Sequence, residues 1–248
     1  QKMCTRMFFY FIKTGCVMIK SVKSCFTKTE LIIWISSVLF IVTAFLIFDR
    51  ENFITLLASL IGVTSLIFCA KGNPTGQILM IIFSLIYTYI SYTFSYFGEM
   101  ITYCGMTLPM AVFSLISWLK HPFNGKKSQV KVNKITKKEI VFMIILSLVV
   151  TFFFYFILRY FNTENLFIST VSVTTSFLAA YLTFRRSPYF AVAYATNDIV
   201  LIILWLLASF SDIRYISVVV CFVAFLFNDI YGFISWKKMK KRQSKSAY

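Results

Sequence analysis

The segment Tyr189–Trp205, YFAVAYATNDIVLIILW, is apolar enough to lie in a lipid bilayer, yet it carries Asn197 and Asp198 near its middle. A carboxylate at that depth costs roughly 2.5–3.5 kcal/mol on insertion scales, so it almost always faces a helix bundle or a water-filled cavity. The spacing of Tyr194, Asp198 and Trp205 puts these three side chains on one helical face. We therefore expect this face to contribute to a binding site.

The composition of the whole chain is that of a membrane protein. The 248 residues are 59% hydrophobic and have a mean hydropathy of +0.79, whereas soluble domains are usually about 45–50% apolar. Several apolar runs reach the roughly 18 residues that a membrane-spanning helix needs. Strands of a membrane barrel would be shorter and would alternate apolar with polar residues. We therefore predict an all-α integral membrane protein with no room for a sizeable soluble domain.

About eight transmembrane helices are expected. They cover residues 31–48, 53–70, 75–97, 101–119, 139–158, 165–184, 188–210 and 214–236. The segment 1–28, which mixes aromatic residues with lysines, is predicted to be a basic amphipathic helix at the membrane interface. The connection Lys120–Lys138 holds seven lysines and is predicted to be a solvated loop.

The distribution of charge predicts the orientation in the membrane. The net charge is +16, and 22 of the 25 Lys and Arg residues lie in the N-terminal segment, the second, fourth and sixth connections and the C-terminal tail. By the positive-inside rule both termini are cytoplasmic, in a cell (inner) membrane. This rule explains the basic charge without a nucleic-acid partner. Five acids are expected on the outer side, namely Asp49, Glu51, Glu99, Glu164 and Asp212. Asp198 and Asp229 remain as the charged residues inside spans.

An internal repeat is visible at an offset of 114 residues. Pro74 matches Pro188 at the start of a predicted helix, and after a four-residue shift Ile116–Trp118 matches Ile234–Trp236. Both copies begin outside and end inside, so the repeat is parallel, and one linker helix must restore the orientation. This 3+1+3 plan with an extra N-terminal helix is a transporter design whose site lies near the midplane. The expected parts are residues 1–28 (basic segment), 29–50 (extra helix), 51–120 (first repeat), 121–160 (loop and linker helix), 161–237 (second repeat) and 238–248 (basic cytoplasmic tail).

A second amide–carboxyl pair, Asn228-Asp229, lies in the last span. Helical geometry puts Asp198 and Asp229 at similar depth on adjacent antiparallel helices, which predicts a shared polar pocket. The alternative is that each polar group bonds a neighbouring helix and holds the bundle together. Gln77 is a further candidate, from the first repeat. The expected substrate-binding residues are Tyr194, Asn197, Asp198, Trp205, Asn228, Asp229 and Gln77.

These side chains indicate the chemistry of the substrate. Aromatic rings stack on planar heterocycles, and carboxylates and amides bond hydroxyls or a carboxamide. A cationic ring would gain from Asp198 and from cation–π contact. No basic residue lies at the midplane, which favours a nucleoside-like molecule over a nucleotide. Phosphate-binding loops, zinc spacings and nucleophile elbows are absent from the sequence, so we expect no enzymatic activity, no metal and no cofactor.

Four segments resemble a known family. They are YFGEMITYCGMTLPM (Tyr96–Met110), SLISWLKHP (Ser114–Pro122), AYATNDIVLIILW (Ala193–Trp205) and FLFNDIYGFISW (Phe225–Trp236). Over roughly residues 30–242 the chain resembles the Pnu-type vitamin transporters, the family of the nicotinamide riboside transporter PnuC and of proteins called nicotinamide mononucleotide transporters. The resemblance implies a duplicated SWEET-like fold, a homotrimer, and facilitated diffusion of nicotinamide riboside, which phosphorylation then traps in the cell.

This chain departs from one sequence pattern of the family. The resemblance implies W-x-x-W-x-x-x-D/N on the seventh helix, which falls on Ala191, Tyr194 and Asp198. The first Trp is therefore missing and the second is Tyr. Thiamine, riboflavin or a deoxynucleoside remain open as substrates. A substrate-binding subunit of a larger, ATP-driven vitamin importer and proton-coupled transport through Asp198 or Asp229 are further alternatives.

Overall fold

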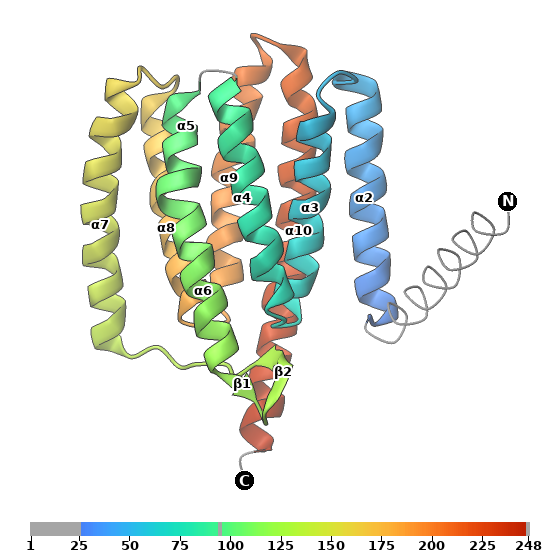
Figure 1. The fold of residues 1–248 in the computed structure, drawn as a ribbon, viewed down its shortest axis with the longest axis vertical. Coiled ribbons are helices and arrows are strands. Elements are labelled where there is room, and N and C mark those ends of the chain that lie inside the picture. The colour runs from blue at the N-terminus through green and yellow to red at the C-terminus, as the bar shows by residue number, and fades with distance from the viewer. Residues whose placement is uncertain (1–25, 94–95, 247–248) are drawn as a thin grey trace, which may run out of the picture. The chain divides into compact units, whose positions relative to one another are not determined.

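The computed structural model describes residues 26–93 and 96–246, and within them eight helices are long and apolar enough to cross a membrane (Figure 1). The eight expected spans are thus confirmed. The helices are α2 (Lys28–Phe48), α3 (Phe53–Ala70), α4 (Thr75–Thr93), α5 (Phe97–Thr102), α6 (Leu108–Lys120), α7 (Lys137–Tyr160), α8 (Leu166–Phe184), α9 (Phe190–Ser209) and α10 (Ile216–Lys245). The π-helix η1 (Tyr103–Thr107) joins α5 to α6 into one span, and the 3-10 turn η2 (Ile213–Tyr215) precedes α10. The amphipathic helix expected over residues 1–28 falls almost wholly outside the described residues.

The chain divides into two units, Gln1–Ser36 and Ser37–Tyr248. The described part of the first unit is the beginning of α2. Thr27 and Glu30 form a capping box there, because the Thr27 amide donates to the Glu30 carboxylate at 2.8 Å and the Glu30 amide donates to Thr27 Oγ1 at 3.3 Å. These bonds satisfy two amides that the helix itself leaves without partners.

In the second unit the two repeats have equivalent turns. The turn after α3 and the turn after α8 each contain a residue in the left-handed region, Gly72 with φ 67° and Arg186 with φ 56°. The amide that follows bonds back to the helix in both copies, at 3.0 Å from Asn73 to the Phe68 carbonyl and at 3.0 Å from Ser187 to the Leu182 carbonyl. Each of these bonded positions is related to its counterpart by the offset of 114 residues.

The repeats also pack on each other in equivalent ways. Helix α10 of the second repeat packs on α3 of the first, and α6 of the first packs on α8 of the second. The Trp236 indole N–H donates to the Cys69 carbonyl at 2.8 Å, and the Trp118 indole N–H donates to the Thr183 carbonyl at 2.9 Å. The two indole rings contact each other with centroids 5.5 Å apart and are almost completely buried. This tryptophan pair lies between the two repeats.

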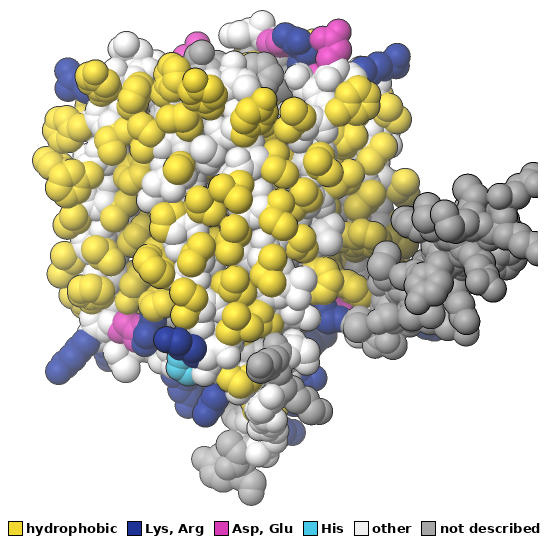
Figure 2. Space-filling view, in the orientation of Figure 1, with side chains coloured by type: hydrophobic (Ala, Val, Ile, Leu, Met, Phe, Trp, Pro, Cys, Tyr) yellow, Lys and Arg dark blue, Asp and Glu magenta, His cyan; other side chains and the backbone are white. Residues whose placement is uncertain are grey.

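The bundle formed by the second unit has two ends of different charge. One end carries the connections with Asp49, Glu164 and Asp212; we call it the acidic end. The other carries Lys71 and Lys120–Lys138; we call it the basic end (Figure 1). In the space-filling view apolar side chains cover the middle of the helices, and Lys and Arg gather at the basic end (Figure 2). The exposed apolar side chains on α7 agree with a helix that contacts lipid.

The basic connection is more ordered than predicted. Residues Pro122–Phe123 (β1) and Lys126–Val130 (β2) form an antiparallel hairpin, so the expectation of a solvated loop is wrong for this part. The amide of Val130 donates to the Gly72 carbonyl at 2.9 Å, and Val130 itself is completely buried. Gln243 holds the end of β2, because its Nε2 donates to the Val130 carbonyl at 3.0 Å and its Oε1 accepts from the amide of Val132, two residues after the strand, at 2.8 Å. Helix α10 is therefore extended to Lys245, where the sequence suggested a tail from residue 238.

Candidate substrate cavity

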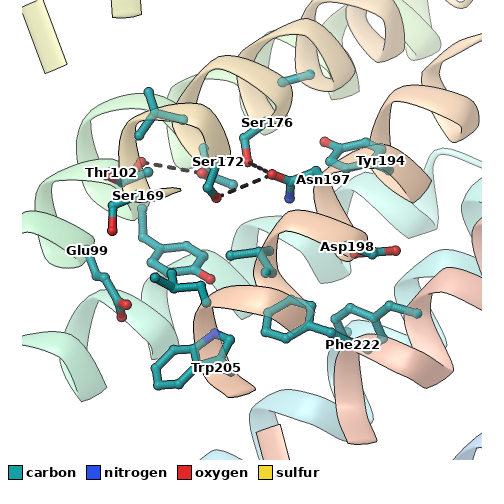
Figure 3. A pocket seen from close by; sticks show the side chains of 18 of the residues that line it. Glu99, Thr102, Ser169, Ser172, Ser176, Tyr194, Asn197, Asp198, Trp205 and Phe222 are labelled. Carbon is teal, nitrogen blue, oxygen red and sulfur yellow. Dashed lines mark hydrogen bonds between the residues drawn. The ribbon is translucent and has the colours of Figure 1, made fainter. Parts of the chain in front are cut away.

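A cavity of about 120 Å³ lies between the two repeats (Figure 3). Its walls come from α3, α4, α5 and η1 of the first repeat, from α8, α9 and α10 of the second, and from Leu158 and Thr163 at the end of α7 and in the connection that follows. Toward the acidic end the cavity meets a wider vestibule of about 370 Å³. The residues that line both spaces are Glu99, Thr163, Ser169, Leu204 and Trp205. The cavity is thus reached from the acidic end.

Five of the seven residues predicted from the sequence line this cavity. Four of them lie on one side of α9, which faces the cavity: Tyr194, Asn197, Asp198 and Trp205. Asp229 reaches the same space from α10. The cavity therefore combines a phenol, an indole, an amide and carboxyl groups, and Figure 3 shows these α9 side chains around one space.

Asn197 is held in place by three hydroxyl groups of α8. Its side-chain oxygen Oδ1 accepts from Ser172 at 3.3 Å, from Thr175 at 2.8 Å and from Ser176 at 3.0 Å. These bonds fix the orientation of the amide and leave the donor Nδ2 without a protein partner among the described residues. Figure 3 shows the bonds to Ser172 and Ser176. Asn197 therefore presents a donor to a ligand. The hydroxyl-rich sequence of α8 is the signal for this arrangement.

Asp198 and Asp229 form a pair of buried carboxyl groups. Each residue is only 4% exposed, and both line the same cavity. Asp198 Oδ2 has no hydrogen-bond partner in the described part of the chain. A buried polar atom without a partner is costly and calls for an explanation. A donor supplied by a bound ligand would satisfy it.

Gln77 and Asn228 are placed away from the cavity. The Gln77 amide donates to Cys69 Sγ at 3.3 Å. Asn228 Nδ2 donates to Ser37 Oγ at 2.8 Å and to the Ala224 carbonyl at 2.8 Å. Neither lines the cavity wall. Both side chains hold helices together, which is the alternative role that polar residues have in membrane helices.

Glu99 is a cavity residue that the sequence analysis missed. We expected it in an outer connection, but α5 begins at Phe97 and carries Glu99 into the wall of the cavity (Figure 3). The expectation that only Asp198 and Asp229 lie in spans is therefore wrong. The available signal was its place within the apolar stretch Tyr96–Met110, where a helix start only four residues earlier than predicted would have included it.

Toward the basic end the cavity is closed by aromatic side chains. Below Tyr194, Phe190 packs edge-on against Trp236 with ring centroids 4.9 Å apart, and Trp236 contacts Trp118. Phe190, Trp118 and Trp236 are each at most 2% exposed. The cavity is therefore open at one end and sealed at the other.

Comparison with known proteins identifies the family. The family described as "Nicotinamide mononucleotide transporter" matches residues 52–238, well over half of the chain. This chain belongs to the nicotinamide mononucleotide transporter family. Together with its eight apolar helices, this membership makes it a multi-pass membrane protein with a transport function and no enzymatic role.

Relatives within the nicotinamide mononucleotide transporter family are distant but match over most of their length. The nicotinamide riboside transporter PnuC of Neisseria mucosa is 25% identical over 216 residues, which cover 86% of this chain and 82% of that protein. The PnuC of Haemophilus influenzae is 20% identical over 193 residues, 77% and 82% of the two chains. The crystal structure of the vitamin B3 transporter PnuC superimposes with a TM-score of 0.75 at 23% identity, covering 88% of this chain and 94% of the other. The fold is therefore shared.

The packing around Ala191 explains why this chain has no tryptophan at the first position of the expected family pattern. Ala191 is completely buried and lies outside the cavity wall. A Cβ atom built on Gly232 of α10 would be 3.6 Å from the Ala191 Cβ, so α9 and α10 approach closely here. An indole does not fit at this contact unless the helices separate.

Proposed function

We propose that this protein takes up nicotinamide riboside, or a closely related nucleoside-like vitamin, by facilitated diffusion across the cell membrane. The observation that carries the proposal is the cavity between the repeats, which joins aromatic rings to carboxyl groups and has no Lys, Arg or His among the described residues that line it. A phosphate would need a cationic partner, so a nucleoside is favoured over a nucleotide. The relatives named nicotinamide riboside transporters support the same class of substrate.

In this proposal different side chains of the cavity bind different parts of the substrate. Tyr194 and Trp205 stack on the heterocyclic ring. Asn197 Nδ2 donates to a carbonyl or hydroxyl oxygen. Asp198 and Asp229 accept hydrogen bonds from ribose hydroxyls, and the donor satisfies Asp198 Oδ2. A positively charged ring gains further from the carboxyl groups and from the faces of the aromatic rings.

The difference between the open acidic end and the closed basic end of the bundle indicates how the transport cycle proceeds. The excess of Lys and Arg supports a cytoplasmic basic end, with both termini on that side. In that orientation the vestibule faces the outside and the tryptophan pair closes the inner end. Alternating access then requires the repeats to rock until Trp118 and Trp236 separate and the vestibule narrows. The resemblance also leads us to propose a homotrimer.

Uptake into liposomes that contain only this protein tests the proposal. Labelled nicotinamide riboside, thiamine, riboflavin and a deoxynucleoside are offered in parallel, with empty liposomes as the control. We expect saturable equilibration of nicotinamide riboside without ATP or an ion gradient. Equilibration of another compound would replace the substrate, dependence on a proton gradient would refute simple facilitation, and tight binding without transport would indicate a subunit of a larger importer.

A further inference from the structure

Glu99 occupies the junction through which a substrate must pass. It lines both the vestibule and the cavity, as does Trp205 on the opposite repeat (Figure 3). Glu99 comes from the first repeat, whereas Asp198 and Asp229 come from the second. A molecule that enters from the acidic end therefore meets Glu99 before it reaches the deeper pair of carboxyl groups.

The backbone around Glu99 is closely packed, so its position is well defined. A Cβ atom on the preceding residue, Gly98, would lie 2.4 Å from Thr163 Oγ1 and 2.9 Å from Leu158 Cδ2. These contacts press the start of α5 against the α7–α8 connection, which only a glycine permits. On the other side Thr102 Oγ1 bonds the Gly98 carbonyl at 2.9 Å. Glu99 is thus carried by a rigid segment rather than by a loop.

The charge of Glu99 is not compensated by the protein. Among the described residues no ion pair includes Glu99. Asp212 at the vestibule differs, because it forms an ion pair with Arg214 at 2.7 Å, and this partner holds the pKa of the Asp212 carboxyl below its ordinary value. No described Lys, Arg or His lines the vestibule or the cavity. Glu164 also lines the vestibule without an ion pair, but it is exposed there and does not reach the cavity. Glu99 is therefore the acidic group without an ion pair at the junction of the two spaces.

We propose that Glu99 is a specificity-determining residue that selects a positively charged ring over a neutral ring of the same shape. An acidic group in a narrow, low-dielectric passage concentrates cations and repels anions. The second observation that points to a ligand is Asp198, which is buried in the same cavity with an oxygen that has no partner. This inference rests on the proposed function, since it assumes that a nucleoside-like molecule crosses here.

The test compares a cation with its neutral isostere in liposomes that contain the full chain. Nicotinamide riboside carries a pyridinium ring, and benzamide riboside replaces it by an uncharged benzene ring. The KM for nicotinamide riboside and the inhibition constant of benzamide riboside are measured for the wild type, Glu99→Gln and Glu99→Asp. Glu51→Gln is the matched control, because Glu51 is 86% exposed at the same end and lines neither space.

We expect Glu99→Gln to raise the KM for nicotinamide riboside by about tenfold or more, as loss of one charge near the ring implies. The inhibition constant of benzamide riboside should stay within about twofold, which also shows that the variant is folded. Glu99→Asp and Glu51→Gln should keep the wild-type preference. Equal losses for both compounds, or no change in either, would overturn the role of Glu99. Absence of nicotinamide riboside uptake by the wild type would instead refute the proposed function.

Discussion

The tryptophan pair at the basic end predicts how strongly the closed conformation is held. Trp118→Phe keeps an aromatic ring but removes the indole donor to the Thr183 carbonyl. That carbonyl still accepts from the Arg186 amide at 2.9 Å, so no buried oxygen is left without a partner. The loss is then the net contribution of one hydrogen bond, about 1 kcal/mol. Since 1.4 kcal/mol is tenfold, the population open at the basic end should rise about fivefold.

The equivalent substitution in the second repeat should have an equal effect on the population open at the basic end. Trp236→Phe removes the donor to the Cys69 carbonyl, which still accepts from the Gly72 amide at 2.9 Å. The double variant should therefore cost about 2 kcal/mol and open the basic end about thirtyfold. The rings are in contact, so a departure from additivity measures their coupling.

Thiol labelling from the basic side measures this opening. Cys69 is 4% exposed beside the tryptophan pair, so its rate of reaction with an impermeant maleimide reports the open population. The other cysteines are replaced for this assay. Trp118→Phe is the more informative variant because the bond it removes goes to Thr183, whereas Trp236 bonds the labelled Cys69 itself. Ile116→Val on the exposed face of α6 is its control. Unchanged labelling in Trp118→Phe and in the double variant would refute the assignment of this pair as the inner closure.

Three further changes test the cavity and the packing around it. Asp198→Ala should abolish uptake while the protein remains inserted and folded in detergent; normal uptake would remove Asp198 from the site. Asn197→Ala deletes the acceptor of three hydroxyl groups and should lower the free energy of unfolding by about 2–3 kcal/mol, measured by denaturant unfolding in detergent; a loss below about 0.5 kcal/mol would contradict the bonding. Gly76→Ala would place its Cβ 2.7 Å from the Cys69 amide nitrogen and should lower the midpoint of thermal unfolding. Gly105→Ala, whose Cβ has its nearest contact at 3.8 Å, should leave the midpoint unchanged. Equal midpoints for the two variants would contradict the close approach of α3 and α4.

The sequence alone was sufficient for features that depend on local chemistry. A run of apolar residues long enough to cross a bilayer has no other stable conformation there, which is why all eight helices were predicted, seven of them within four residues of both ends. The last helix continues nine residues beyond its predicted end. The repeat was visible because the turns at Pro74 and Pro188 need similar residues in both copies. The face of α9 that bears Asp198 was predicted because a carboxylate cannot face lipid.

Only the tertiary structure decided which polar residues meet at the site. Gln77 and Asn228 carry amides as Asn197 does, but their NH2 groups donate to residues of neighbouring helices and neither side chain lines the cavity. Glu99 joined the cavity because α5 begins earlier than its hydropathy indicates, at a glycine packed against the α7–α8 connection. The hairpin through Val130 was hidden in a lysine-rich segment because its partners Gly72 and Gln243 are distant in sequence. Hydropathy measures one helix at a time, whereas these outcomes depend on which two helices touch.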